Sequence, residues 1–211
     1  MRHQPLAGAL LFAAGVVALM GIITAETFYP GYSTRDNTIS DLGASMPPES
    51  VVIEPSATIF NATMIVSGPL IIAGALLLFG AAGGRSRGRS RGFAILALLV
   101  GLFGVGVLGV GIFPGNNPTM HPIFSILTFV AGGFSAVASG RQVAPPFREL
   151  SEVLGGIALL NLALFFALGP DSPLMELGIG GLERWVAYPI VLWTVGFGGY
   201  LMGSSKSDGV F

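Results

Sequence analysis

Six long apolar stretches constrain the fold of this chain more than any other feature of its sequence. A helix needs about 20 mostly apolar residues to cross the hydrocarbon core of a bilayer. The six stretches cover about residues 6–25, 57–82, 93–112, 121–140, 153–168 and 185–202. They are continuous apolar runs, without the alternation that marks the strands of a membrane barrel. The sequence therefore predicts an all-α fold, a six-helix transmembrane bundle that forms a single integral membrane domain over residues 1–211.

Composition excludes other classes of protein. Only 10% of the residues are charged, against roughly 25% in a soluble domain. The hydrophobic fraction of 52% excludes intrinsic disorder, which needs low hydrophobicity and high charge. A net charge of -1 offers no electrostatic footprint for nucleic acid, so the expected partner is the lipid bilayer.

The basic residues divide unequally between the two sides of the membrane if every stretch crosses it. One side holds Arg2, Arg85, Arg87, Arg89, Arg91, Arg141, Arg148 and Lys206. The other holds Arg35 and Arg184, together with most of the acidic residues. The positive-inside rule places the first side, with both termini, in the cytoplasm. We call the other side outer. The first stretch is longer than the apolar core of a signal peptide, so we expect it to be retained.

Several kinds of chemistry lack their residues. The chain has no Cys and only two His, so a thiolate or multi-histidine metal site is not expected within one chain, and no cofactor is expected. Neither a Gly-x-Ser-x-Gly nucleophile elbow nor a phosphate-binding loop is present. No acid lies deep in a predicted span, which argues against a proton relay through carboxylates.

The outer segment from Glu26 to Pro55 is the one long predicted loop, and loops of this length are often functional or disordered. It is rich in short polar side chains that bond their own backbone. Ile39 and Leu42 are spaced as on one helical turn, and Gly43 is placed to end it. We therefore predict a short helix in this loop, lying on the outer mouth of the bundle.

The fourth span carries a polar stripe. Helical periodicity brings its members to one face: His121, Ser125, Thr128, Gly132, Ser135 and Ser139. Such a stripe is either a packing seam or one wall of a polar cavity, and the sequence leaves both open. Arg184, at the outer start of the sixth span, should have a specific partner, such as Asp36 or Asp41.

The motifs occur in a characteristic order. Ser33, Asn37, Ile39, Ser40, Leu42 and Gly43 precede Asn61, the His121-x3-Ser125-x3-Phe129 pattern and Gly181-x-Glu183-Arg184. With six spans, nearly the whole chain resembles an uncharacterised prokaryotic family, catalogued as domain of unknown function nine-nine-eight. The resemblance implies a multi-pass protein of a prokaryotic cytoplasmic membrane, with no established activity. The layout is also distantly similar to the Frag1/DRAM/Sfk1-like membrane proteins, some of which are linked to lipid remodelling, as an analogy of fold alone.

All of these motif residues map to the outer loop or the outer third of a span. We therefore predict an outward-facing polar pocket for a small polar ligand or lipid headgroup. Its lid is formed by Asp36, Asn37, Ser40 and Asp41, its floor by Asn61, His121, Glu183 and Arg184, with Ser33 and Ser125 as further candidates.

Three functions remain open from the sequence. The first is binding, or transport, of such a ligand, with Arg184 holding an anionic group and His121 tuning it with pH. The second is a structural or accessory subunit, whose seams pack a partner helix or a second copy. The third is a lipid-modifying enzyme in which His121 is a base and Ser33 or Ser40 a nucleophile. Whether the protein is an enzyme is left undecided, and no catalytic residue is assigned.

Overall fold

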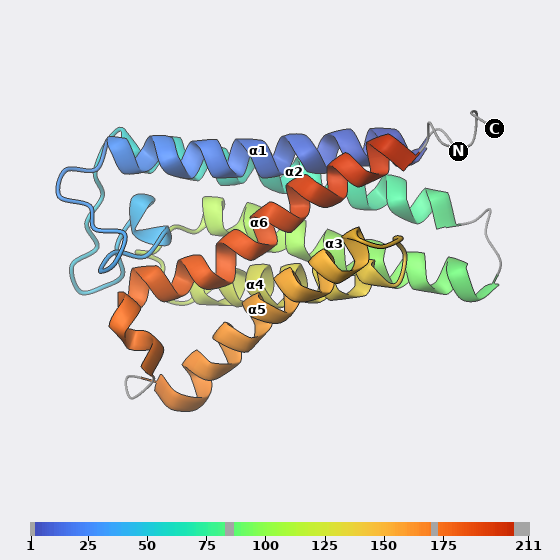
Figure 1. Cartoon of the computed structure of the whole chain (residues 1–211). Helices are drawn as coiled ribbons and strands as arrows, with labels where there is room; N and C mark the ends of the chain where they lie inside the picture. Colours follow the sequence, from blue (N-terminus) through green and yellow to red (C-terminus); the bar gives the residue numbers. More distant parts are fainter. Residues whose placement is uncertain (1–2, 83–86, 170–172, 205–211) are drawn as a thin grey trace.

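A computed structural model describes residues 3–82, 87–169 and 173–204 of the chain (Figure 1). Its long helices are α1 (His3–Thr27), α2 (Ser56–Ala82), α3 (Arg87–Ile112), α4 (Met120–Gly140), α5 (Phe147–Leu168) and α6 (Gly178–Ser204). All six are long and apolar enough to span a membrane, and the described residues contain no strand. The predicted all-α, six-helix membrane fold is confirmed. Arg2, Arg85, Asp171, Lys206 and Asp208, which entered the charge argument, lie outside the described residues.

The helices pack as a closed bundle. Each packs against the next along the chain, and α1 packs against α6 to complete the ring. Figure 1 shows that α1 begins and α6 ends at one end of the bundle, with the long loop between α1 and α2 at the other. We call these the basic end and the acidic end, after the charges of their loops. Trp193 and Phe197 of α6 and Leu96 of α3 are fully buried in the core.

Glycines on α3 let it approach both of its neighbours closely. A Cβ on Gly106 would lie 2.7 Å from the backbone nitrogen of Thr128 in α4. A Cβ on Gly111 would lie 2.8 Å from the carbonyl oxygen of Asn61 in α2. Small residues commonly allow such close contact between membrane helices, where burial of apolar surface supplies little driving force.

Several helices extend beyond their predicted bounds; the fifth, for example, begins at Phe147 rather than at residue 153. The sixth helix begins at Gly178 rather than at Trp185, and the third begins at Arg87 within the Arg-rich segment. Glu183 and Arg184 find partners inside the protein, so their charge does not exclude them from the span. The prolines at 69 and 189 lie inside continuous helices, because neighbouring groups in a membrane bundle can accommodate a proline.

The loop over residues 28–55 folds back on the acidic end. It contains a single 3-10 turn, η1 (Ser40–Leu42), followed by Gly43. Leu42 is fully buried and Ile39 nearly so, which anchors this turn in the bundle. Gly43 is required for space rather than for an unusual backbone angle, since its φ is -87° and a Cβ there would meet Phe60 at 2.8 Å. The predicted short helix is thus present as one turn.

Candidate functional site

Arg184 ties the loop to the last helix. Its Nη1 atom donates hydrogen bonds to the carbonyl oxygens of Thr34 (2.9 Å), Asn37 (3.1 Å) and Gly180 (2.9 Å). Its Nη2 atom donates to Oε1 of Glu26 at 2.7 Å and to the hydroxyl of Tyr32 at 2.6 Å. The guanidinium therefore links the end of α1, the loop and the start of α6.

As predicted, an acid at this end of the bundle pairs with Arg184, but the two acids named as candidates for the partner of Arg184 were wrong. Its ion pair is with Glu26, in the last turn of α1, rather than with Asp36 or Asp41. The two side chains are 10% and 20% exposed, so the pair is largely shielded from solvent. Asp36 instead accepts a hydrogen bond from the Ser33 hydroxyl at 2.8 Å, which stabilises a turn within the exposed part of the loop.

Tyr32 completes this cluster. Its hydroxyl donates to the carbonyl oxygen of Thr38 at 2.8 Å while it accepts from Arg184. Burial raises the pKa of Tyr32 above its ordinary value, and the neighbouring Arg184 opposes part of that rise. The phenol therefore stays protonated and keeps both bonds at neutral pH.

Glu183 holds the other side of the loop. Its carboxylate accepts hydrogen bonds from the backbone N–H groups of Ile39 and Ser40. Asp41 lies close enough to interact electrostatically with Glu183. Asp41 is itself held in place by the N–H of Thr38, which donates to its Oδ2 atom at 2.8 Å. Glu183 and Arg184, adjacent in sequence, thus contact two different parts of the loop.

His121 is buried at the start of α4. Its Nδ1 atom lies 2.8 Å from the carbonyl oxygen of Phe113. Because a carbonyl can only accept, the proton of that bond is on Nδ1. The ring of Phe113 stacks on that of Phe124 at 5.4 Å, so the segment that fixes the imidazole is itself packed.

Two asparagines contact the backbone of the loop: Asn61 from α2, and Asn37 from within the loop itself. The Nδ2 atom of Asn61 lies 3.5 Å from the carbonyl oxygen of Gly43, and its buried Oδ1 atom has no hydrogen-bond partner among the described residues. Oδ1 of Asn37 accepts from the N–H of Ser33 at 3.0 Å. Both side chains contact the loop backbone.

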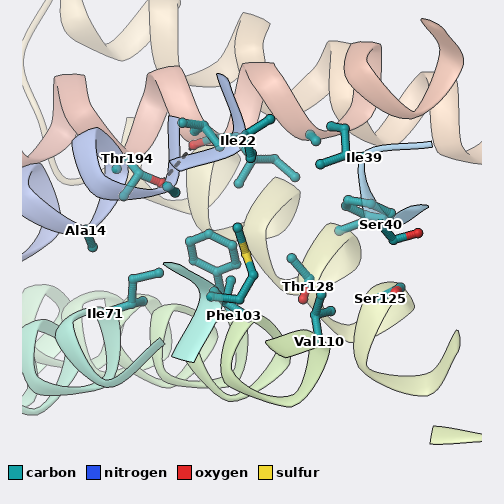
Figure 2. A pocket seen from close by; sticks show the side chains of 18 of the residues that line it. Ala14, Ile22, Ile39, Ser40, Ile71, Phe103, Val110, Ser125, Thr128 and Thr194 are labelled. Atoms are coloured by element: carbon teal, nitrogen blue, oxygen red, sulfur yellow. Dashed lines mark hydrogen bonds between the residues drawn. The ribbon is translucent and has the colours of Figure 1, made fainter. Parts of the chain in front are cut away.

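Two neighbouring cavities lie beneath the loop, and a separate groove of about 280 Å³ between α5 and α6 is lined by Arg184. A central cavity of about 80 Å³ lies among α1, α2, α3, α4 and α6. Figure 2 shows Ser40, Ser125 and Thr128 gathered around one end of it, with Ala14 and Ile71 at the other. A larger cleft of about 300 Å³, which we call the lateral cleft, lies between α4, α5 and α6 beneath the loop.

The lateral cleft brings together four of the predicted site residues. Its lining includes Ser40, His121, Ser125 and Glu183. Ser40, Ser125 and Glu183 also line the central cavity, and together with Phe129 they stand between the two. The other predicted residues do not line the lateral cleft: Ser33, Asp36, Asn37, Asp41, Asn61 and Arg184.

The polar stripe on α4 serves as both cavity wall and packing seam. At the acidic end, Ser125 and Thr128 line the central cavity. Nearer the basic end, Ser139 is buried and accepts a hydrogen bond from the indole nitrogen of Trp193 at 2.9 Å. A Cβ on Gly132 would lie 2.6 Å from Ile190, so this part of the stripe packs closely against α6.

Sequence reasoning missed several residues of the site. Glu26 was counted only as an outer acid, although its position at the end of the first span could have indicated an ion pair with the start of the sixth. The aromatic residues of α5 that line the lateral cleft, Phe165 and Phe166, gave no signal, because apolar side chains are expected throughout a span.

These observations define the class of protein: the chain is a multi-pass integral membrane protein built from six helices. It belongs to a family described as "Protein of unknown function (DUF998)", whose model matches residues 12–200. No curated protein and no solved structure matches the chain.

Proposed function

We propose that this protein binds one amphiphile from the bilayer in the lateral cleft, without chemical change. The headgroup would sit at the acidic end beside Glu183 and His121, and the acyl chain would run along α5. The observation that carries this proposal is the lining of the cleft, which is mostly apolar and has its one charged residue, Glu183, and His121 near the loop. Ser125 and Asn161 are its polar residues further along the spans.

The rim of the cleft supports a ligand that enters from the membrane. Ile126 of α4 and Phe166 of α5 line the cleft and are 44% and 63% exposed. Both lie in helices that are apolar enough to span the bilayer, so their exposed faces meet lipid. α5 is also the least buried of the six helices, which leaves this side of the bundle open to lipid.

The size of the lateral cleft supports a headgroup and the first part of a chain. Small-molecule sites enclose about 300–1,000 Å³, and the cleft has about 300 Å³. A whole phospholipid is larger than this. Its chains would therefore remain largely in the surrounding bilayer while the cleft holds its polar end.

The polar contacts favour binding over the catalytic alternative. The hydroxyl of Ser33 donates to Asp36, and that of Ser40 lies 3.1 Å from the Thr38 hydroxyl. Within the described residues, no hydrogen bond joins either serine to His121, whose Nδ1 is bonded to Phe113. A serine nucleophile needs a base within hydrogen-bond reach.

The charge distribution supports an orientation. At the basic end, Arg87, Arg89 and Arg91 lie in the first turns of α3, Arg141 follows α4, and Arg148 lies in the first turn of α5. The acidic loop lies at the opposite end. The positive-inside rule then places the acidic end, and with it the lateral cleft, at the outer leaflet of a prokaryotic plasma membrane, with both termini in the cytoplasm.

The experiment fills the lateral cleft and counts retained lipid. Leu162 of α5 lines the cleft, whereas Leu160 of the same helix does not and is 59% exposed to lipid. The full chain is extracted gently from bilayers and its bound lipids are counted by native mass spectrometry. We expect the wild type and Leu160→Trp to retain one lipid, and Leu162→Trp to lose it.

Two results would contradict the proposal. One is equal retention by both tryptophan variants, which would place the lipid outside the cleft. The other is the recovery of a lipid-free chain with one stoichiometric protein companion, which would favour the structural subunit. Thermal unfolding in the same detergent controls for folding of each variant.

A further inference from the structure

We infer that the amphiphile bound in the lateral cleft carries a cationic nitrogen in its headgroup, as ethanolamine and choline lipids do. The inference rests on the proposed function and adds the chemical class of the ligand. It reverses the expectation from the sequence, in which Arg184 was to hold an anionic group.

The charge of the lining carries the inference. Glu183 is the one Asp, Glu, Lys or Arg among the residues that line the cleft. Arg184 and Asp41 both interact electrostatically with Glu183, with opposite signs, and neither lines the cleft. The charge in direct contact with the cleft is therefore that of Glu183, which attracts a cation and repels an anion at short range.

Arg184 does not neutralise the cleft by direct contact. Its Nη1 and Nη2 atoms donate to three carbonyl oxygens, to Glu26 and to Tyr32. Arg184 lies outside the cleft lining, on the side of α6 that faces Tyr32 and Glu26. The Nη1 and Nη2 atoms of Arg184 are therefore committed elsewhere, and its buried Nε atom has no hydrogen-bond partner among the described residues. No hydrogen bond among these residues joins Arg184 to the Glu183 carboxylate.

The hydrogen-bonding capacity of the cleft also matches a donor or a cation. Backbone N–H groups of Ile39 and Ser40 bond the Glu183 carboxylate. A carboxylate offers about four acceptor positions, so it can accept further bonds from a ligand. For a headgroup without N–H donors, three phenylalanines line the cleft, and aromatic rings can attract quaternary ammonium groups: Phe129, Phe165 and Phe166.

A carboxylate at this depth benefits from such a partner. Removing a charged group from water is costly unless a counter-charge and hydrogen bonds compensate. Hydrogen bonds between ionised partners are shorter and roughly twice as strong as neutral ones. One bond of this kind changes a binding constant by roughly tenfold or more.

The test compares three headgroups on identical acyl chains. The full chain is reconstituted in vesicles with equal amounts of phosphatidylethanolamine, phosphatidylcholine and phosphatidylglycerol, and retained lipid is identified by native mass spectrometry. We expect the protein to retain roughly ten times as much phosphatidylethanolamine and phosphatidylcholine together as phosphatidylglycerol. Preference for ethanolamine would assign recognition to N–H bonds with Glu183, and preference for choline to the aromatic faces.

A matched pair of variants locates the effect. Glu183→Gln keeps the side-chain length and an acceptor oxygen for the loop, and should lower the retention of the ethanolamine and choline lipids to the level of phosphatidylglycerol. Glu176→Gln removes the same charge from the exposed turn η3 (Pro173–Leu177), outside the cleft, and should leave the preference unchanged.

The outcomes separate this inference from the proposed function. Retention of phosphatidylglycerol equal to or above that of the amine lipids overturns the cationic headgroup, as does an unchanged preference in Glu183→Gln. In either case a lipid is still bound, and the proposed function stands. Failure of the wild type to retain any lipid overturns both. If Glu183→Gln does not fold, the comparison of headgroups on the wild type decides.

Discussion

The Nη2 atom of Arg184 lies 2.7 Å from the Oε1 atom of Glu26, which joins the start of the last helix to the end of the first across 158 positions of sequence. Because α1 also packs along α6, this ion pair closes the ring of helices at its acidic end. The same guanidinium fixes the loop backbone at Thr34 and Asn37. One side chain thus secures both the bundle and the cover of the lateral cleft.

Replacing Arg184 should therefore destabilise the protein strongly. Removing one member of a buried ion pair costs about 3–5 kcal/mol, because the remaining charge is left without a partner. Arg184→Gln should lower the free energy of unfolding by about 3 kcal/mol, measured by thermal or denaturant unfolding in detergent. Arg184→Lys should restore little of this stability, because one ammonium group cannot donate to all of the acceptors that the planar guanidinium reaches.

A double-mutant cycle of Arg184 and Glu26 separates the free energy of their ion pair from that of the hydrogen bonds between Arg184 and the carbonyl oxygens. Glu26→Gln should be less costly than Arg184→Gln, since Arg184 keeps its other four acceptors. If the two single variants and the double variant prove additive, the ion pair contributes nothing beyond its separate groups, and the cross-link assigned to it is wrong.

Tyr32 should make stability depend on pH in the alkaline range. Burial raises the pKa of Tyr32 in the folded protein above its ordinary value of about 10. The corresponding stability is fully present below pH 10 and is lost as pH rises toward the folded-state pKa, because the unfolded chain ionises first. We expect Tyr32→Phe to flatten the fall in unfolding free energy above pH 10, by comparison with the wild type.

At neutral pH, Tyr32→Phe should also lower stability. It removes the acceptor of Arg184 and the donor to Thr38, at a cost of about 1–3 kcal/mol for groups left unsatisfied. A variant with wild-type stability at pH 7 and an unchanged alkaline profile would show that the hydroxyl makes neither contact.

Much of the fold could be predicted from the sequence, because each span is a local run of apolar residues. The six helices follow from those runs, and the turn at Ser40–Leu42 follows from the spacing of Ile39 and Leu42. Both depend on neighbours along the chain, so no tertiary information is needed. The start of α6 at Gly178 could not be predicted, because Glu183 and Arg184 become compatible with a span only once the loop has covered them.

The candidate site was predictable only in part. The depth of the polar residues pointed to the acidic end of the bundle, and four of the predicted residues line one cleft there: Ser40, His121, Ser125 and Glu183. The direction of each side chain was not predictable, since neighbours such as Glu183 and Arg184 point to different surroundings. The partner of Arg184 depends on how α1 packs against α6, which no local pattern specifies.

Packing of α3 against α4 gives a third prediction. A Cβ at Gly106 would lie 2.7 Å from the Thr128 nitrogen, which belongs to backbone and cannot rotate away. Gly106→Val should therefore destabilise the bundle by about 1–3 kcal/mol, the usual cost of overpacking. Gly80, at which a Cβ would meet nothing within 4 Å, is the matched control. Gly80→Val should change stability by less than about 1 kcal/mol.

Detergent unfolding of both glycine variants checks this prediction. Equal effects of the two substitutions would mean that α3 and α4 do not approach at backbone distance. Gly106→Val should also elute at the same volume as the wild-type protein in size-exclusion chromatography, which excludes a change in assembly as the cause.

The bond between Trp193 and Ser139 gives the last prediction, at the basic half of the bundle. Trp193 is fully buried, and its indole N–H donates to the Ser139 hydroxyl at 2.9 Å. Ser139→Ala leaves that donor unsatisfied, at a cost of about 1–3 kcal/mol. Ser135 is an equally buried serine of α4, but its hydroxyl donates to the Ala131 carbonyl of its own helix. Ser135→Ala should therefore lower the free energy of unfolding by less than Ser139→Ala does.

Intrinsic fluorescence distinguishes the two variants, because Trp193 is buried whereas Trp185, the other tryptophan, is 51% exposed. A shift of the buried emission in Ser139→Ala, absent in Ser135→Ala, confirms that the α4 stripe bonds α6 at this level. Identical spectra and stabilities for the two variants would show that this part of the stripe packs against α6 without the hydrogen bond to Trp193.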